Sequence, residues 1–407
     1  MRIMVEKKTS HTVIIGAGFT GISCAIRLAK LLPDMRITLV SNKDYFEYYP
    51  ALYRVVTGSS PLQACIMLSD IFEQFSNVSC VQDTIVNVDV QNKKVIGEQG
   101  AYTGDYIVLG VGSENTYFNI EGVAELSFNF KSIHPALRLK KRVQELFESS
   151  QNVSPEEKLL NLRFVIVGGG PSGVELAGEL AWYTKKLAHE NNIDQSFVTI
   201  DLIEAGPRIL GRMSEKISQR ATKRLRTIGV NVYANRMLIK DESWTVFLKD
   251  MKIGSKTVIW AAGVRNNILF ESLDEFEYDG RARVVVDDYL EAKGFKNIFV
   301  GGDNARTEYS GMAQTALYDG KYIAKSIAAK ENDDDVKKYT PHAVSYDIPI
   351  GPGWAVLVHM GVTLYGRLAW WMRHIIDLRF YLSVLPIRKA LRIFFSGRSY
   401  DYKKHTS

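Results

Sequence analysis

Two glycine-rich loops, about 150 residues apart, predict an α/β protein with two Rossmann-like dinucleotide-binding units. Each loop follows a strand-like apolar run and precedes a helix-like run. Glycines at this spacing allow a tight turn and a close approach of the backbone to a pyrophosphate, which the N–H groups at the start of the helix then face. The spaced glycines are Gly16, Gly18 and Gly21 in the first loop and Gly168, Gly170 and Gly173 in the second. Two such loops predict two dinucleotides held close together, an arrangement suited to hydride transfer between them.

The first unit is predicted to begin with a strand, loop and helix over residues 12–32, followed by a second strand over 36–40. Strand-like runs continue over 78–90 and 106–109, and a glycine-containing turn occupies 110–113. Strands that alternate with helical segments in this way predict a parallel sheet.

The second unit is predicted to be inserted into the first. A helix over 135–149 and a polar loop over 150–157 precede the second strand, which starts near Leu162, and the unit continues to 258–263. Residues 297–303 then form one more apolar strand that ends on an acid.

The composition is that of an ordinary globular protein, long enough for two or three domains. Of the 407 residues, 46% are hydrophobic and 24% are charged, which does not indicate disorder. The net charge of +6 is concentrated near the C-terminus, where residues 361–407 contain nine Lys or Arg and two acids. Such a basic segment suits nucleic acid or an anionic membrane. We interpret the acidic and then basic run 331–338 as a solvated linker.

Residues 354–395 combine aromatic, apolar and basic side chains and predict amphipathic helices at a membrane surface. At helical spacing, Ile387, Ala390 (or Leu391) and Phe394 form one apolar face. Basic residues beside that face are Arg388, Lys389 and Arg392, and an apolar stripe upstream comprises Leu364, Leu368, Trp371, Ile375, Leu378 and Leu382. The alternative is a segment that mediates dimerisation or covers the core, and both descriptions fit a membrane-bound dimer. Nucleic acid fits less well, because the apolar face would have nothing to bury against.

Neither the cysteines nor the N-terminus indicates a metal site or export. Cys24, Cys65 and Cys80 lack C-x-x-C and zinc spacings, so we expect them to fill apolar space in a reducing compartment. Residues 1–8 lack the apolar core of a secretory signal, and no stretch reaches the roughly 18 uninterrupted apolar residues of a spanning helix. The chain is therefore expected to fold in the compartment where it is made, on one side of any membrane that it contacts.

Several short motifs, in their order along the chain, resemble those of the type II NADH dehydrogenases. These are the single-subunit, non-pumping NADH:quinone oxidoreductases of the two-dinucleotide-binding flavoprotein superfamily. The resemblance covers nearly the whole chain and implies a glutathione-reductase-like fold. The motifs occupy residues 49–53 (YPALY), 112–122, 173–180 (GVELAGEL), 260–264 (WAAGV), 302–303 (GD) and 313–314 (AQ).

The resemblance implies that the first loop binds FAD without a covalent bond. Where the family has an acid for the adenosine ribose, this chain has Ser41 and Asn42, whose hydroxyl and amide still hydrogen-bond a ribose. Asp303 resembles the family acid that contacts the ribityl and pyrophosphate region, and capping of the following helix is the alternative role. Further expected cofactor-binding residues in the same motifs are Gly112, Gly263 and Ala313.

NADH is expected at the second loop. Glu204 ends the next strand of that unit, where a carboxylate accepts a hydrogen bond from the ribose 2′-hydroxyl of NADH and repels the 2′-phosphate of NADPH. The nearby Arg208 could accommodate that phosphate, but we favour NADH. Glu175 lies where the family has a carboxylate near the nicotinamide and flavin, and an interaction with the helix N-terminus is its alternative role.

A quinone is the expected electron acceptor. Relatives that pass electrons through paired cysteines differ from this chain, which lacks such a pair. A quinone, a soluble carrier protein or oxygen then remains as the acceptor. The family has an A-Q-x-A-x-Q motif beside the flavin and the quinone, of which this chain keeps Gln314 but has Tyr318 as the last residue. On a helix that starts near Gly311, these two residues are expected to share one face. With Glu175, they are the expected catalytic residues.

We therefore expect an FAD-binding domain over 1–125 and 280–335, an NADH-binding domain over 126–279 and a membrane-association region over 336–407. The expected activity is oxidation of NADH through FAD and two-electron reduction of a membrane quinone, without metal or proton pumping. The expected location is the cytoplasmic, or another NADH-containing, face of a membrane with anionic lipid. A homodimer is possible, and binding to nucleic acid is not expected. The alternatives are a reductase of a soluble carrier such as ferredoxin or rubredoxin, and a signalling protein similar to apoptosis-inducing factor.

Overall fold

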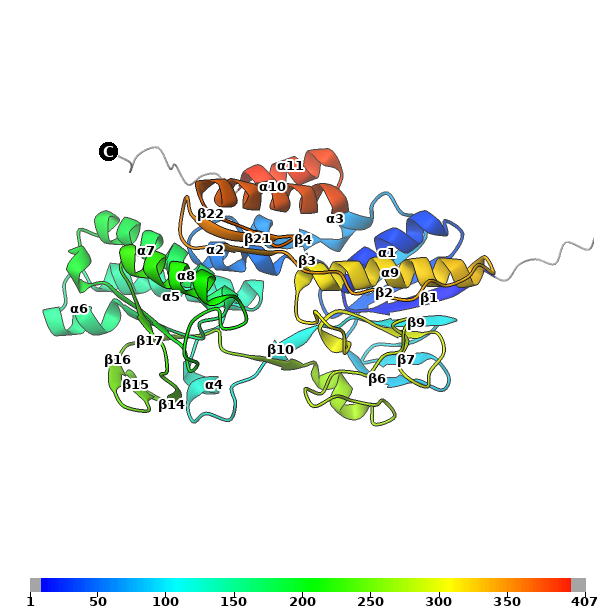
Figure 1. Ribbon diagram of the computed structural model, residues 1–407, viewed down its shortest axis with the longest axis horizontal. Helices are drawn as coiled ribbons and strands as arrows, with labels where there is room; N and C mark the ends of the chain where they lie inside the picture. Colours follow the sequence, from blue (N-terminus) through cyan, green and yellow to red (C-terminus); the bar gives the residue numbers. More distant parts are fainter. Residues whose placement is uncertain (1–8, 397–407) are drawn as a thin grey trace, which may run out of the picture.

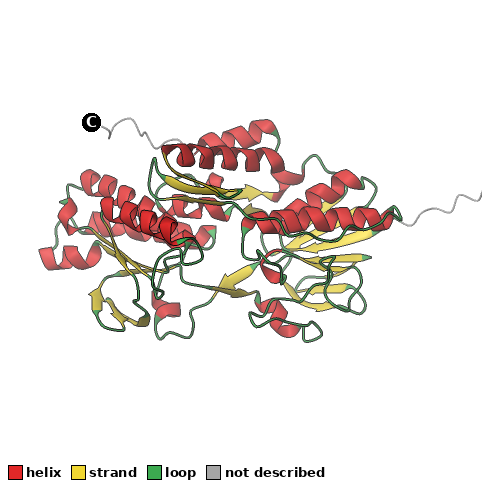
Figure 2. Cartoon of the chain, viewed as in Figure 1, coloured by secondary structure: helices red, strands yellow, loops and turns green. Residues whose placement is uncertain are grey.

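The computed structural model describes residues 9–396 and shows two α/β halves with the C-terminal segment lying across one side of both (Figure 1). Each half has its own parallel sheet, and helices and smaller antiparallel sheets surround these two sheets (Figure 2). Residues 1–8 and the basic residues after Ser396, on which part of the sequence interpretation rests, lie outside the described residues.

The first half is built on a parallel sheet with the strand order β19-β9-β1-β2-β5. One face of the sheet packs against α1 and α9, and the other face packs against the small sheet β6-β7-β8 and residues 269–305. Residues 78–90, a single apolar run in the sequence, form two strands of different sheets. The bounds are β1 His11–Ile15, α1 Phe19–Leu31, β2 Arg36–Ser41, β3 Tyr45–Glu47, α2 Leu52–Val56, β4 Cys65–Met67, α3 Leu68–Phe72, β5 Val78–Gln82, β6 Ile85–Asp89, β7 Lys94–Gly97, β8 Ala101–Thr103, β9 Tyr106–Leu109, β19 Ile298–Val300 and α9 Ala313–Glu331.

The second half has a parallel sheet with the order β13-β12-β11-β17, and α5, α7 and α8 contribute to the core beside it. The antiparallel sheet β14-β15-β16 packs on the opposite side. The predicted polar loop 150–157 is wrong in its second part, where α6 begins. Pro155 occupies the first turn of that helix, and the Ser154 hydroxyl accepts the N–H of Glu157 at 3.3 Å, a capping signal that the prediction missed. The bounds are α4 Val123–Leu126, α5 Ile133–Ser149, α6 Pro155–Asn161, β11 Arg163–Val167, α7 Pro171–Glu190, β12 Thr199–Ile203, α8 Glu215–Thr227, β13 Val230–Tyr233, β14 Leu238–Glu242, β15 Thr245–Leu248, β16 Lys252–Gly254 and β17 Thr257–Trp260.

The chain crosses between the halves twice, in β10 (Ser113–Asn115) and β18 (Val264–Asn266), which pair antiparallel. Because β9 precedes the second half and β19 follows it within one sheet, the predicted insertion of the second unit into the first is confirmed.

The C-terminal segment contains a small sheet as well as the predicted helices. Strands β20 (Tyr346–Pro349), β21 (Ala355–His359) and β22 (Val362–Gly366) form an antiparallel sheet against which α10 (Arg367–Val384) packs, followed by α11 (Ile387–Ser396). Leu364 therefore lies in a strand and does not belong to a helical stripe, because turn glycines at 351, 353 and 361 separate two strand-length apolar runs here.

The apolar face predicted for the last helix is also revised. Ala390 and Phe394 are buried against the protein and cover the core, whereas the exposed apolar residues of α11 are Ile387, Leu391 and Phe395. The predicted free cation Lys389 binds the carboxylates of Asp70 and Glu73.

Candidate active site

The first glycine loop joins β1 to α1 and admits only glycine at two positions. Gly16 has a φ of +96°, and a Cβ on Gly21 would lie 1.9 Å from the carbonyl oxygen of Gly16. Helix α1 starts at Phe19 with Gly18 as its N-cap, without a side-chain cap or an acidic residue in the first turn. The loop and the first N–H groups of α1 therefore fit a pyrophosphate.

The second glycine loop repeats this geometry between β11 and α7. Gly168 has a φ of +114°, and a Cβ on Gly173 would lie 2.0 Å from the Gly168 carbonyl oxygen. Gly170 is the N-cap of α7, and its Cβ position has no neighbour within 4 Å. The two halves thus carry matching sites for a dinucleotide phosphate.

Glu204 follows β12 directly and is fixed by the second loop. Its Oε2 accepts the N–H of Gly169 at 2.7 Å, and its Oε1 accepts the N–H of Gly206 at 2.6 Å. A carboxylate oxygen has a further lone pair, so both oxygens retain acceptor capacity for a ribose diol. Arg208, by contrast, donates to the carbonyl oxygen of Gly211 at 2.8 Å and is held by its own loop.

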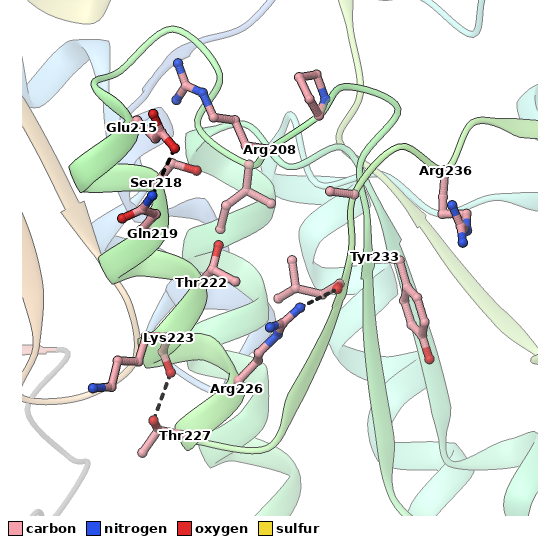
Figure 3. A pocket seen from close by; sticks show the side chains of 14 residues that line it. Arg208, Glu215, Ser218, Gln219, Thr222, Lys223, Arg226, Thr227, Tyr233 and Arg236 are labelled. Atoms are coloured by element: carbon pink, nitrogen blue, oxygen red, sulfur yellow. Dashed lines mark hydrogen bonds between the residues drawn. The ribbon is translucent and has the colours of Figure 1, made fainter.

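A hollow of ≈ 1190 Å³ lies beside this loop, between α8 and the end of β13 (Figure 3). Its cationic lining residues are Arg208, Lys223, Arg226 and Arg236, against one acid, Glu215. This basic surface next to Glu204 suits the phosphate-bearing end of a nucleotide.

Asp303 lies in a short 3₁₀ turn, Gly302–Asn304, after β19. Its Oδ2 accepts the Ser113 hydroxyl at 2.6 Å, and Lys131 Nζ donates to that hydroxyl at 3.0 Å. Because the next helix, α9, begins only at Ala313 with Met312 as its N-cap, the alternative that Asp303 caps it is wrong. Asp303 is therefore available to a cofactor on the loop side.

Lys131 is a site residue that sequence reasoning missed. Burial lowers its pKa to about 8, although the charges of Asp303 and Glu114 oppose this shift. A single lysine in an apolar stretch carries no motif signal, and only the fold brings it from the segment before α5 to Asp303.

The other expected FAD residues are distributed around the first half. Ser41 is buried at the end of β2, where its hydroxyl accepts the N–H of Lys43 at 3.2 Å, and Asn42 is exposed. The side chain of Asn304 bonds both the N–H and the carbonyl oxygen of Gly112, at 2.9 and 2.7 Å, which brings Gly112 beside Asp303.

The remaining two expected cofactor residues occupy different places. Gly263 lies at the crossing between the halves, where a Cβ would be 2.6 Å from the Phe118 ring. Ala313 is the first residue of α9 and is partly buried.

Glu175 lies in the second turn of α7, partly buried. Burial raises its pKa to about 8, with Asp347 and Asp377 contributing in the same direction and Arg373 and Arg54 opposing. The first turn of α7 contains no acid, and the field of a helix terminus falls off within that turn, so a role at the helix N-terminus does not account for Glu175. One turn later on α7, burial also raises the pKa of Glu179, to about 7.

The charges that act on Glu175 form a buried network, which we call the junction cluster: Arg54, Asp347, Arg373 and Asp377. Asp377 on α10 accepts from Arg54 of α2 at 2.8 Å and from the Tyr48 hydroxyl at 2.6 Å, and it pairs with Arg373. Burial opposes its ionisation, but the two guanidinium groups outweigh burial and lower the pKa of Asp377.

Arg373 joins the cluster to the segment before α2. Its guanidinium lies 3.2 Å from Asp347 and donates to the Pro50 carbonyl oxygen at 3.0 Å. Helix α10 is therefore bonded to the YPALY motif of the first half.

Gln314 and Tyr318 lie four residues apart on α9, and both contact the segment 339–345. The Gln314 side-chain oxygen accepts the N–H of Ser345 at 2.9 Å. The Tyr318 ring lies edge-on to His342, with 4.2 Å between ring centroids. The structure thus brings the pair together, with that segment as their neighbour.

Comparisons with known proteins agree with this geometry. Residues 10–320 match the family described as pyridine nucleotide-disulphide oxidoreductase. A type II NADH:quinone oxidoreductase of Mycobacterium tuberculosis is 33% identical over 79% of this chain and 72% of its own length, and that of Staphylococcus aureus is 27% identical over 93% and 97%.

Two solved structures share the fold over nearly the whole chain. The structure of NDH2 from Plasmodium falciparum in complex with NADH superimposes with a TM-score of 0.86 at 19% identity, covering 96% of this chain and 97% of that one. The sulfide:quinone oxidoreductase of Aquifex aeolicus gives 0.79 at 18% identity, covering 96% and 92%. The chain belongs to the pyridine nucleotide-disulphide oxidoreductase family and, within it, to the type II NADH:quinone oxidoreductases.

Proposed function

We propose that this chain oxidises NADH and reduces a membrane quinone by two electrons, with FAD as the intermediate carrier and without pumping protons. The observation that carries this function is the pair of glycine loops, one at the carboxyl end of each parallel sheet, in a member of the type II family. In this proposal Gly16, Gly18, Gly21 and Asp303 hold FAD, and Gly168, Gly170, Gly173 and Glu204 hold NADH. When bound, FAD supplies the chemistry of accepting a hydride and releasing two electrons.

The protein supplies orientation, charge and protons. The Ser113 hydroxyl donates to Asp303 and is proposed to orient it toward the cofactor. Lys131 donates to the same hydroxyl, as an ammonium group or, at higher pH, as a neutral amine. Glu175, with a pKa of about 8, holds a proton at neutral pH and is the proposed donor to the quinone, which takes up two protons on reduction. Gln314 and Tyr318 are proposed to contact the quinone ring, since the amide nitrogen of Gln314 is left for a ligand while its oxygen bonds Ser345.

The proposed membrane contact is the exposed apolar face of the last two helices, which we call the apolar face. It comprises Leu368, Trp371, Ile375 and Leu382 of α10 and Ile387, Leu391 and Phe395 of α11. Both helices lie together at one side of the molecule (Figure 1). A contiguous apolar surface of this kind, flanked by exposed Arg367, Arg388 and Arg392, fits the headgroup region of an anionic bilayer. Among residues 9–396, no helix has both the length and the hydrophobicity to span a bilayer.

The proposed domains keep the predicted roles, with FAD at 1–125 and 280–335, NADH at 126–279, and the membrane contact at 336–407 on the NADH-containing, for example cytoplasmic, side. We propose that the two inner boundaries lie closer to the N-terminus than these numbers, because the chain crosses between the halves at Ser113–Asn115 and Val264–Asn266 and residues 269–276 pack on the first half. Dimerisation stays a prediction.

Steady-state oxidation of NADH with a panel of acceptors tests this function. We expect the purified protein to be yellow, to release FAD on heating, and to turn over with membrane quinones. Faster turnover with a ferredoxin or rubredoxin than with any quinone would assign it instead to soluble carriers. Absence of turnover with every acceptor, despite bound FAD, would favour a signalling role.

A further inference from the structure

Four cations gather where α1, α9 and α10 meet, without an acidic partner in the part of the chain that the structure describes. A hollow of ≈ 380 Å³ between α1 and α9 is lined by Arg27, Tyr318, Lys321, Tyr322 and Lys325. Arg379 of α10 is close enough to act on Lys321, whose pKa is lowered by burial and then by the charges of Arg379, Arg27 and Lys325. We call Arg27, Lys321, Lys325 and Arg379 the basic cluster.

The basic cluster lacks a counter-charge among the residues that the structure describes. Over residues 9–396, no carboxylate lies within ion-pair distance of any of its four cations, and the charges that lower the Lys321 pKa in addition to burial are all cationic. The Nε of Arg27 is moreover buried and has no hydrogen-bond partner. The four positive charges repel one another, and one of them carries a buried N–H donor without an acceptor. An anion with several acceptor oxygens, such as a phosphate, would neutralise these charges and accept that hydrogen bond.

The basic cluster also borders the apolar face. Arg379 follows Ile375 by four residues and precedes Leu382 by three on α10, and both apolar side chains are exposed, by 64% and 42% respectively. Residues at these spacings are neighbours on a helix surface. A ligand that satisfies both surfaces has a phosphate at one end and acyl chains at the other.

We propose that the basic cluster binds the phosphate headgroup of one anionic phospholipid, whose acyl chains lie along the apolar face. This inference rests on the proposed membrane contact but adds a discrete site, centred on the hollow between α1 and α9, to which the C-terminal region contributes only Arg379. Free inorganic phosphate has the same oxygens but gains nothing from the apolar face, so it binds more weakly.

The variant Lys321→Gln/Lys325→Gln tests the site, because both lysines are exposed on α9 and their removal leaves no cavity. The matched control is Lys216→Gln/Lys249→Gln, which removes two exposed lysines from the second half. Retention of bound FAD by both variants checks folding. Each protein is titrated calorimetrically with dihexanoyl-phosphatidylglycerol below its micelle concentration and with inorganic phosphate. Each is also sedimented with vesicles of phosphatidylcholine, with and without phosphatidylglycerol.

We expect the short-chain lipid to bind more tightly than inorganic phosphate, and the α9 variant to bind this lipid about 30-fold more weakly, from roughly fivefold per Lys near an anionic surface. The control should bind as the unmodified chain does, and sedimentation with neutral vesicles should be unchanged in all three. An equal loss in both variants would overturn the site in favour of diffuse charge, and equal binding of inorganic phosphate would reduce it to a free-anion site.

The two titrations separate this inference from the proposed membrane contact. If the chain fails to sediment with any vesicle but binds the short-chain lipid through Lys321 and Lys325, the site is supported and the membrane contact is refuted. If vesicles bind but the short-chain lipid does not, the membrane contact stands and the site is refuted.

Discussion

Two alanine substitutions in the second glycine loop should have different effects. In Gly173→Ala, the new Cβ would lie 2.0 Å from the Gly168 carbonyl oxygen. The Gly168 backbone is itself confined, because a Cβ on Gly168 would lie 2.6 Å from the Ala261 carbonyl group. An insertion into so tight a place costs about 1–3 kcal/mol of folding free energy, so we expect a lower Tm. Flavin reduction by NADH should also be slower, because relief of the contact displaces the loop that is proposed to hold NADH. In Gly170→Ala no atom lies within 4 Å of the Cβ, so the Tm should be unchanged.

Gly170→Ala should nevertheless slow flavin reduction, because the pyrophosphate of NADH is expected to approach the backbone at this position. Anaerobic stopped-flow absorbance with NADH measures the rate, dithionite reduction checks the flavin, and thermal unfolding gives the Tm. Gly211→Ala is the control, since its Cβ would make only an ordinary contact, 3.7 Å from the Arg208 carbonyl oxygen. If the flavin of the Gly170→Ala protein is reduced at the normal rate, the pyrophosphate of NADH does not bind at this loop. A Gly173→Ala protein with normal Tm and rate would refute the argument from close contact.

Five further substitutions have defined outcomes. Glu204→Ala should lower kcat/KM for NADH by about 10 to 150-fold, because a charge-assisted hydrogen bond contributes roughly 1.5–3 kcal/mol. The variant should also discriminate less against NADPH. An unchanged ratio of kcat/KM for NADH to kcat/KM for NADPH would show that this residue does not contact the nucleotide. Gln314→Ala and Tyr318→Ala should slow reoxidation by quinone in stopped flow and leave reduction by NADH intact. The native state keeps the Glu175 proton up to about pH 8, whereas the unfolded chain releases it near the usual pKa of 4.5, so folding stability is lost as pH rises across this interval. The Tm advantage of Glu175→Gln should therefore grow from about pH 5 to about pH 8, and a constant difference contradicts the raised pKa. Asp377→Ala leaves the buried guanidinium group of Arg54 without its counter-charge and removes one of the two carboxylates beside Arg373, so it should lower the free energy of unfolding by about 3–5 kcal/mol in urea.

Local patterns were sufficient to predict the two strand, loop and helix units that we propose to bind phosphate. Within each loop the tight contact is local, because it joins the last spaced glycine to the carbonyl oxygen of the first, Gly21 to Gly16 and Gly173 to Gly168. Glu204 bonds the N–H group of residue 169, which is 35 positions away, and that of residue 206. Its position was still predictable, because the strand that it follows lies next to the strand before the glycine loop in the βαβ unit.

Long-range contacts explain what the sequence did not reveal. Lys131 reaches Asp303 across 172 positions through Ser113, and Asp377 meets Tyr48 across 329, so neither contact leaves a periodic signal. The C-terminal apolar pattern was ambiguous because Ala390 and Leu391 are neighbours in sequence but face the core and solvent respectively. A hydrophobic pattern alone does not show which of two apolar faces the rest of the protein covers.

Helix α10 separates two environments, the solvent-exposed apolar face and the buried junction cluster, by only one helix diameter. Trp371 and Ile375 are exposed on its outer side, and Arg373 and Asp377, in the same two turns, are buried against the YPALY segment on its inner side. A helix with its side chains is about 10 Å across. If the apolar face contacts lipid as proposed, a quinone ring that passes beside α10 would travel about one helix diameter from the lipid, while its isoprenoid tail stays among the acyl chains. Long-tailed substrates would then not need to dissolve in water, and catalytic efficiency in vesicles should depend on the ring and little on the number of isoprene units.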